Sequence, residues 1–132
     1  MLAQIFETTP NQRIGDKIAC STSLTIDSTL AFVGRAPDLI KVDAEGHEVK
    51  IFEGGRKILS CPTAPALCFE FNPLTMSESG TDKRQLEEQL ANYQFYYISD
   101  FQHQRMEFGL PIPHLSRLDW VCNLFAVPKT RR

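Results

Sequence analysis

The segment Asp38-Leu-Ile-Lys-Val-Asp-Ala-Glu-Gly-His-Glu48 decides the fold that we expect for this chain. Leu39 to Val42 form a short, nearly continuous apolar run, which is the pattern of a strand buried on both faces in a parallel sheet. Acidic residues follow at once, and open α/β sheets bind ligands at the carboxyl ends of their strands. The segment therefore predicts a buried strand with a ligand site at its end.

The sequence after this strand alternates between helical and extended patterns. Apolar residues repeat with helical spacing from Glu48 to Leu59, although Gly54-Gly55 weakens that helix and suggests close approach to its sheet. Ala66 to Phe71 is a second short apolar run. A crossover helix between the two runs makes them parallel neighbours. Beyond them we expect a loop from Asn72 to Gly80, a helix that begins with a capping box at Asp82 and Gln85, and strands from Phe95 to Ile98 and from Trp120 to Val127.

The pattern predicts a three-layer α/β fold, with a mostly parallel sheet and helices on both of its faces. No clear helix separates the last two strands, so the final strand can enter the sheet antiparallel. Before the deciding segment, Lys17 to Ile26 is rich in β-branched residues and favours a strand. Asp27 then looks like the cap of a short helix that stops near Gly34 and Pro37.

Composition narrows the class of protein. The 132 residues fit a single domain, with 42% hydrophobic and 23% charged residues, as in ordinary globular domains. A formal net charge of −2 leaves no excess of Lys and Arg for phosphates, so we do not expect a nucleic-acid partner. No apolar run approaches the length of a membrane span, and the start of the chain lacks the pattern of a signal peptide, so we expect a cytoplasmic protein with no membrane partner. Its four cysteines show no CxxC pairing, which argues against disulfide or metal roles.

The candidate site residues lie at the ends of the two apolar runs. Asp43 can bind a cationic or amine-bearing ligand, take a proton or hold a hard metal ion. Glu45 and His47 follow it, Lys41 precedes it, and Glu70 interrupts the second run. Structural alternatives stay open: Asp43 or Glu45 as a helix cap, Lys41 as a strand residue that extends its amine to solvent, His47 as a solvent-facing ring, and Glu70 as an ion-pair partner of Lys41. A carboxylate-based metal hydrolase is a weaker reading, because His103 and His114 lie far off in the sequence, and we assign no metal.

Several of these segments together resemble the FkbM-type methyltransferases. The resemblance rests on Leu39-Ile-Lys-Val-Asp-Ala-Glu-Gly-His-Glu-Val49, on Glu53-Gly54 and on Cys68-Phe-Glu-Phe71. Leu24-Thr-Ile-Asp-Ser-Thr-Leu30 and Asn123-Leu-Phe-Ala-Val-Pro128 are similar to flanking segments of that family. Only the acidic motif is specific, while the rest is hydrophobic pattern.

The resemblance implies a Rossmann-like sheet, S-adenosylmethionine as methyl donor, and an oxygen of a sugar or small metabolite as acceptor. It makes Asp43 the first candidate for contacting the methionine amino group of the donor or for orienting the acceptor. Glu45, His47 and Glu70 become candidates for a general base, and Lys41 completes the candidate set. Methyl transfer from a sulfonium needs mainly alignment, so positioning of the acceptor could matter more than strong acid–base work.

The same resemblance predicts an incomplete domain. A family member normally begins with a strand and a glycine-rich loop at the cofactor, and no such run precedes Lys17. We therefore expect residues 1–132 to form one truncated domain whose cofactor binding is in doubt. The alternative function is a non-catalytic binding or assembly module. In either case the strand Leu39 to Val42 is expected to expose an edge, which favours a homo-oligomer or pairing with the missing N-terminal half. Met1 to Ile26 are an alternative cover for this edge, as a substitute strand that folds back.

Overall fold

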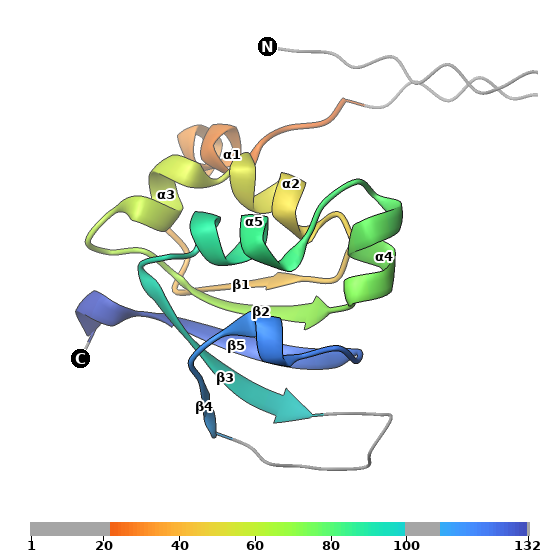
Figure 1. Cartoon of the computed structure of the whole chain (residues 1–132). Helices are drawn as coiled ribbons and strands as arrows, with labels where there is room; N and C mark the ends of the chain where they lie inside the picture. The colour runs from red at the N-terminus through yellow and green to blue at the C-terminus, as the bar shows by residue number, and fades with distance from the viewer. Residues whose placement is uncertain (1–21, 100–108, 132) are drawn as a thin grey trace, which may run out of the picture.

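The computed structural model describes residues 22–99 and 109–131, which form a mixed α/β fold (Figure 1). The elements in chain order are α1 (Ile26–Val33), β1 (Leu39–Val42), α2 (Glu48–Glu53), α3 (Arg56–Ser60), β2 (Ala66–Phe71), α4 (Pro73–Glu78), α5 (Lys83–Gln89), β3 (Tyr93–Ser99), β4 (Pro111–Ile112), the 3₁₀ helix η1 (Leu115–Arg117), β5 (Cys122–Pro128) and the 3₁₀ helix η2 (Lys129–Arg131).

The five described strands form one sheet in the order β1-β2-β5-β3-β4. The parallel pairing of β1 with β2 is confirmed, with Leu39 opposite Ala66 and Val42 opposite Phe69. The antiparallel entry of the final strand is also confirmed, because β5 lies between β2 and β3 and runs against both. The expectation of a mostly parallel sheet is wrong for the described strands. The pairings of β2 with β5, of β5 with β3 and of β3 with β4 are all antiparallel.

Helices cover one face of this sheet, so the expected three layers with helices on both faces are not found in the described residues. Contacts join α1 to α3, α3 to α2, α2 to α5 and α5 to η1, which makes a single helical layer. The connections from β1 to β2 and from β2 to β3 step across the sheet in the same direction, and right-handed crossovers of that kind place their helices on the same face.

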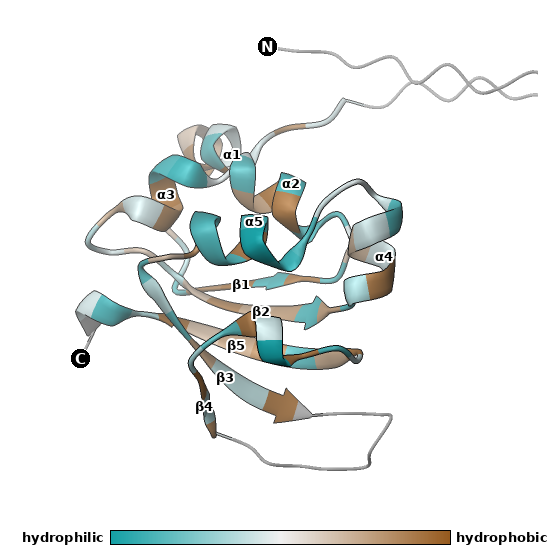
Figure 2. Ribbon diagram, viewed as in Figure 1, coloured by the Kyte–Doolittle hydropathy of each residue, from teal (hydrophilic) through white to brown (hydrophobic). Residues whose placement is uncertain are grey.

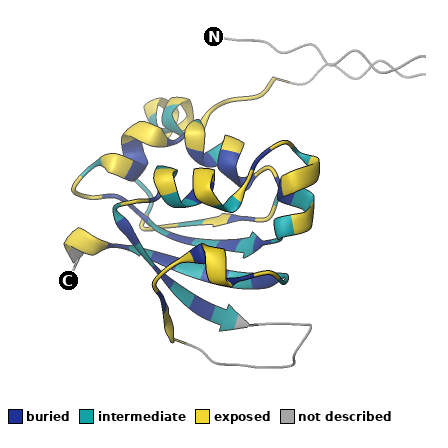
Figure 3. Ribbon diagram, viewed as in Figure 1, coloured by how far each residue is buried: buried dark blue, intermediate teal, exposed yellow. Residues whose placement is uncertain are grey.

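Burial along the strands follows this two-layer arrangement. Buried residues alternate with half-buried ones along β2 and β5, as the dark blue and teal bands of Figure 3 show. The buried set includes Leu67, Phe69 and Phe71 on β2 and Leu124 on β5, which pack beneath the helices. Leu86 is the one buried residue of helix α5, and the rest of that helix is hydrophilic (Figure 2). The described fold is therefore a helical layer packed on one face of a sheet.

Strand β1 departs from the expected burial on both faces, because it is the edge of the described sheet. Ile40 and Val42 turn toward the helices, whereas Leu39 is 52% exposed and Lys41 is exposed. No described strand lies beside the outer edge of β1.

The region before β1 differs from the expected strand. Residues 17–21 lie outside the described part of the chain, residues 22–25 have no regular structure, and Ile26 already belongs to α1. The short helix that stops at Gly34 is confirmed, with Gly34 as a left-handed C-cap. Its N-cap is Thr25, whose hydroxyl accepts from Ser28 N, so the assignment of that cap to Asp27 was wrong.

The expected helix from Glu48 to Leu59 is broken into α2 and α3 at Gly54-Gly55. The glycines permit close approach, but to the start of α1 rather than to the sheet. A Cβ on Gly55 would lie 3.1 Å from a side-chain carbon of Ile26, and one on Gly54 would lie 3.3 Å from Thr25 Cβ. The break lets α1 pack against α3.

The segment from Asn72 to Gly80, expected to be a loop, contains helix α4. Asn72 caps it, because its side-chain oxygen accepts from the amides of Leu74 and Thr75, and Pro73 occupies the first turn. The capping box of Asp82 and Gln85 at the start of α5 is confirmed.

The described cysteines Cys61, Cys68 and Cys122 form no disulfide. No helix within residues 22–99 and 109–131 has the length and apolar character that a membrane span requires.

Candidate functional site

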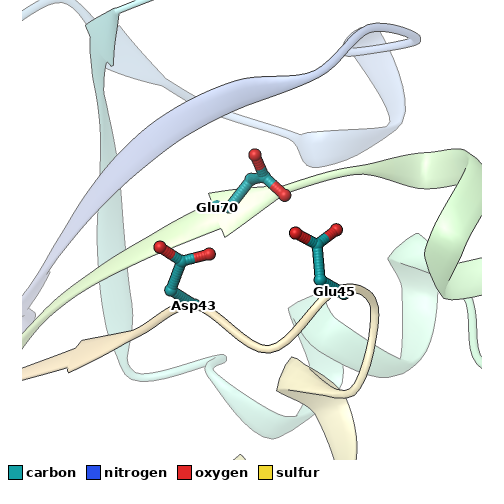
Figure 4. A group of neighbouring side chains, drawn as sticks. All are labelled: Asp43, Glu45 and Glu70. Carbon is teal, nitrogen blue, oxygen red and sulfur yellow. The ribbon is translucent and has the colours of Figure 1, made fainter.

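Three carboxylates meet where the parallel strands β1 and β2 end. Asp43 directly follows β1, Glu45 lies two residues further on, and Glu70 is the penultimate residue of β2. One carboxylate oxygen from each lies within 4.8 Å of the others. Figure 4 shows the three side chains directed toward a common space. We call Asp43, Glu45 and Glu70 the acid group. Parallel pairing creates it, because neighbouring parallel strands end at the same edge of a sheet.

A tight turn positions two members of the acid group. His47 N donates to Ala44 O at 3.1 Å, and both residues between them have positive φ, 47° at Glu45 and 90° at Gly46. Glycine adopts this conformation readily, whereas a glutamate held there stores about 1 to 2 kcal/mol of strain. Gly46 therefore relieves crowding at this turn.

The charge of the acid group is only partly neutralised. Lys41 Nζ lies 3.1 Å from Asp43 Oδ2, so its ion pair is with Asp43 and not with Glu70. Among the described residues, Glu45 and Glu70 have no ion pair. Burial raises the pKa of Glu70 above its usual 4.5, and the charges of Glu45, Asp43 and Glu48 raise the pKa further. Half-buried Glu70 therefore holds a proton more tightly than a free glutamate does.

Glu48 supports the turn from beneath, a role that the sequence did not reveal. It is buried, with 1% of its surface exposed, and its Oε1 accepts from Ala44 N at 3.0 Å. Its other oxygen has no hydrogen-bond partner among the described residues. Asp43 and Glu45 do not cap α2, because the N-cap residue of that helix is His47.

The two described histidines lie outside the acid group. His47 is exposed at the N-cap position of α2 and makes no side-chain cap bond. His114 lies beside Glu87, with 3.5 Å between Nδ1 and Oε1, and His103 falls outside the described residues. The metal-hydrolase hypothesis was based on Asp43, Glu45 and His47. No histidine of the described residues joins the carboxylates as a possible metal ligand.

The acid group can perform three kinds of chemistry. It can bind an organic cation, offer oxygen ligands to a hard metal ion, or accept a proton at Glu70. Asp43 and Glu45 are exposed, so a ligand reaches them without rearrangement. A surface groove of about 580 Å³ lies elsewhere, between α2–α3 and α5, and none of the three carboxylates lines it. The site is an open strand edge rather than a closed pocket.

Comparison with known proteins gives one match. A family model described as a methyltransferase FkbM domain matches residues 9–104, which include the acid group and both strands that carry it. No curated protein and no solved structure matches the chain.

Proposed function

Because the chain belongs to the FkbM methyltransferase family, we propose that it forms part of an S-adenosylmethionine-dependent O-methyltransferase whose acceptor is a sugar or another small metabolite. The family match supports a methyltransferase domain. The observation that carries the proposal further is the convergence of Asp43, Glu45 and Glu70 at the ends of two adjacent parallel strands. Ligands of open α/β sheets bind at such an edge.

The acid group fits one end of the proposed cofactor. S-Adenosylmethionine, when bound, supplies a methyl group activated on a cationic sulfur. Its methionine part also carries an ammonium group, and the exposed carboxylate of Asp43 is suited to accept hydrogen bonds from that group. The adenosine part has no comparable fit in the described residues, because their glycines form no GxGxxG-like run and Gly54-Gly55 packs against α1.

Glu70 is suited to accept the proton that an acceptor hydroxyl loses on methylation. A general base works best when its pKa approaches the working pH, and the pKa of Glu70 is shifted in that direction. Glu45 and His47 remain alternative bases, and Lys41 limits how much charge Asp43 presents. Holding the acceptor oxygen in line with the methyl group is the larger part of the task.

Calorimetric titration with S-adenosylmethionine and S-adenosylhomocysteine tests the proposal. Asp43→Asn should weaken binding of either compound at least about tenfold, roughly 1.4 kcal/mol, because a charge-assisted hydrogen bond is lost. Asp38→Asn is the matched control, since Asp38 is exposed at the other end of the same strand. Equal binding by both variants would contradict the role of Asp43, and no binding by the unaltered chain would favour the second candidate function.

That second candidate is assembly through the outer edge of β1, beside which no described strand lies. Asp38 O accepts from Ala66 N, so residues 38, 40 and 42 direct their backbone groups to β2 and residues 39 and 41 direct theirs outward. An apolar edge with free backbone groups is a template for another strand. We propose that it pairs with a second copy or with a polypeptide that carries the remaining half of the domain.

Sedimentation velocity at several concentrations tests this assembly. Leu39→Pro removes an outward amide without removing a bond to β2, and should abolish self-association. Leu39→Ala keeps the amide and should retain most of it, which separates backbone pairing from side-chain burial. If the unaltered chain stays monomeric as its concentration is raised, pairing between two copies is wrong. The remaining partner is then a polypeptide that carries the other half of the domain, which is tested by adding it to the chain and repeating the sedimentation.

A further inference from the structure

Two separate segments carry the acid group, so its geometry depends on what joins them. Asp43 and Glu45 lie on the turn between β1 and α2, whereas Glu70 lies on β2, which continues through Asn72 into α4. Pairing of β1 with β2 brings the two strand ends together, and the contact between the turn and α4 adds a second constraint on how far the two acids of the turn lie from Glu70.

The turn and α4 touch through their backbones. A Cβ on Gly46 would lie only 2.3 Å from the carbonyl carbon and oxygen of Thr75, so only glycine fits at this position. Gly46 is buried. The turn therefore packs directly on the third residue of α4, and a side chain between them would push them apart.

Ser79, the C-cap residue of α4, binds the turn through its hydroxyl. Ser79 Oγ lies 2.6 Å from Gly46 O and 2.8 Å from Met76 O. Met76 O already accepts from the amide of Thr81 at 2.9 Å, so the single hydroxyl proton of Ser79 is best assigned to the closer Gly46 O. Thr81 Oγ1 lies 3.1 Å from Ser79 Oγ, which holds the hydroxyl in place.

A second link fixes the same corner of α4. Lys50 Nζ, from α2, donates to Ser79 O at 2.8 Å. Ser79 therefore binds the turn through its side chain, at Gly46, and binds the helix that follows the turn through its backbone carbonyl, at Lys50. Rotation of α4 away from the turn would break both bonds.

We propose that Ser79 is a positioning residue of the acid group, whose hydroxyl holds the turn that carries Asp43 and Glu45 at a fixed distance from Glu70. The Ser79 hydroxyl bonds to Gly46, Met76 and Thr81 and to none of the three carboxylates, so it acts through Gly46. The importance of this spacing for methyl transfer rests on the function proposed above, but the spacing itself is a property of the chain without a ligand.

Titration of the Glu70 side-chain carboxyl by NMR tests the proposal. In Ser79→Ala the turn loses its side-chain bond to α4, while the bond from Lys50 to the backbone carbonyl remains. We expect the turn to shift and the carboxylates to move apart, so the pKa of Glu70 should fall part of the way toward 4.5, because burial still raises it but the repulsion from Glu45 and Asp43 weakens. Ser79→Thr keeps the hydroxyl and should keep the raised pKa. Ser77→Ala is the matched control, an exposed serine on the same helix, and should titrate like the unaltered chain.

A role of Ser79 in stability alone gives a different result, namely a lower melting temperature with an unchanged Glu70 titration, and that result would overturn the proposal. If Ser79→Ala does not fold, Ser79→Cys, similar in size but a weak donor, gives the same reading: a lowered pKa supports positioning and an unchanged one refutes it. The titration needs no cofactor. A lowered pKa in a chain that does not bind S-adenosylmethionine would therefore uphold Ser79 and refute the proposed function.

Discussion

Asp27 and Glu70 are both half-buried carboxylates, but the two ends of the molecule use them in opposite ways (Figure 1). At the α1–α3 junction, the two oxygens of Asp27 accept from the amides of Lys57 and Ile58, at 3.1 and 3.0 Å. At the ends of β1 and β2, Glu70 faces two further carboxylates and has no cation of its own among the described residues.

The difference separates a carboxylate that stabilises the fold from one that is available to a ligand. Asp27 caps α3 although it belongs to α1, so its charge is fully used inside the protein. The acid group keeps like charges together and holds Glu45 at positive φ, both of which cost free energy. Uncompensated charge and local strain together are typical of a site whose partner comes from outside.

The largest expected effect comes from breaking the acid end at Gly46. Gly46→Ala forces a Cβ into the backbone of Thr75 and a side chain into a φ of 90°, so it should cost about 3 kcal/mol or more of unfolding free energy. Gly80→Ala is the control, because Gly80 has a φ of 76° with nothing within 4 Å of the added carbon, and it should cost about 1 kcal/mol. Urea denaturation of both variants measures the difference. Equal costs would show that the contact with α4 is loose.

Breaking the other end at Asp27 should have the next largest effect. Asp27→Ala leaves two amides of α3 without partners and should lower the unfolding free energy by about 2 kcal/mol, while Asn, with one accepting oxygen, should lower it by about half as much. Asp119→Ala is the control, because Lys83 is the one ion-pair partner of that exposed carboxylate among the described residues, and the change should cost less than about 1 kcal/mol. A loss for Asp27→Ala no greater than that of the control would remove Asp27 as the cap of α3.

Local sequence patterns predicted the elements whose causes are local. The strand at Leu39, the strand at Ala66 and the capping box at Asp82 were predicted correctly, because each depends on neighbours in sequence. Helix α4 was missed, because its six residues bury only Met76 and show no helical repeat. The hydrogen bonds from the amides of α3 to Asp27 were missed as well, because the donors lie 30 and 31 residues away in the sequence.

The acid group could be predicted from the sequence only in part, because long-range contacts also shape it. Parallel pairing of two strand ends was enough to place Asp43, Glu45 and Glu70 together. The burial of Glu48 and the bond from Ser79 to Gly46 depend on how α2 and α4 pack, and no spacing in the sequence indicates either. The motif thus predicted which side chains form the site, while tertiary packing decides what holds them.

The smallest expected effect concerns the charge on Glu70, and it has the opposite sign to the effect at Asp27. The folded chain raises the pKa of Glu70 above the usual 4.5, so it binds that proton more tightly than the unfolded chain does. Stability then falls as the pH rises from 4.5 through the folded pKa, because ionised Glu70 is disfavoured only in the folded state. Glu70→Gln should therefore melt at a higher temperature than the unaltered chain at pH 8, and the gap should close as the pH is lowered below 4.5. Melting curves recorded without added divalent cations across this range provide the measurement, with Glu88→Gln, an exposed acid on α5, as the control. A gap that is absent at pH 8, or that widens on acidification, would mean that Glu70 is stabilised like Asp27 and that the two ends of the molecule do not differ in the way inferred here.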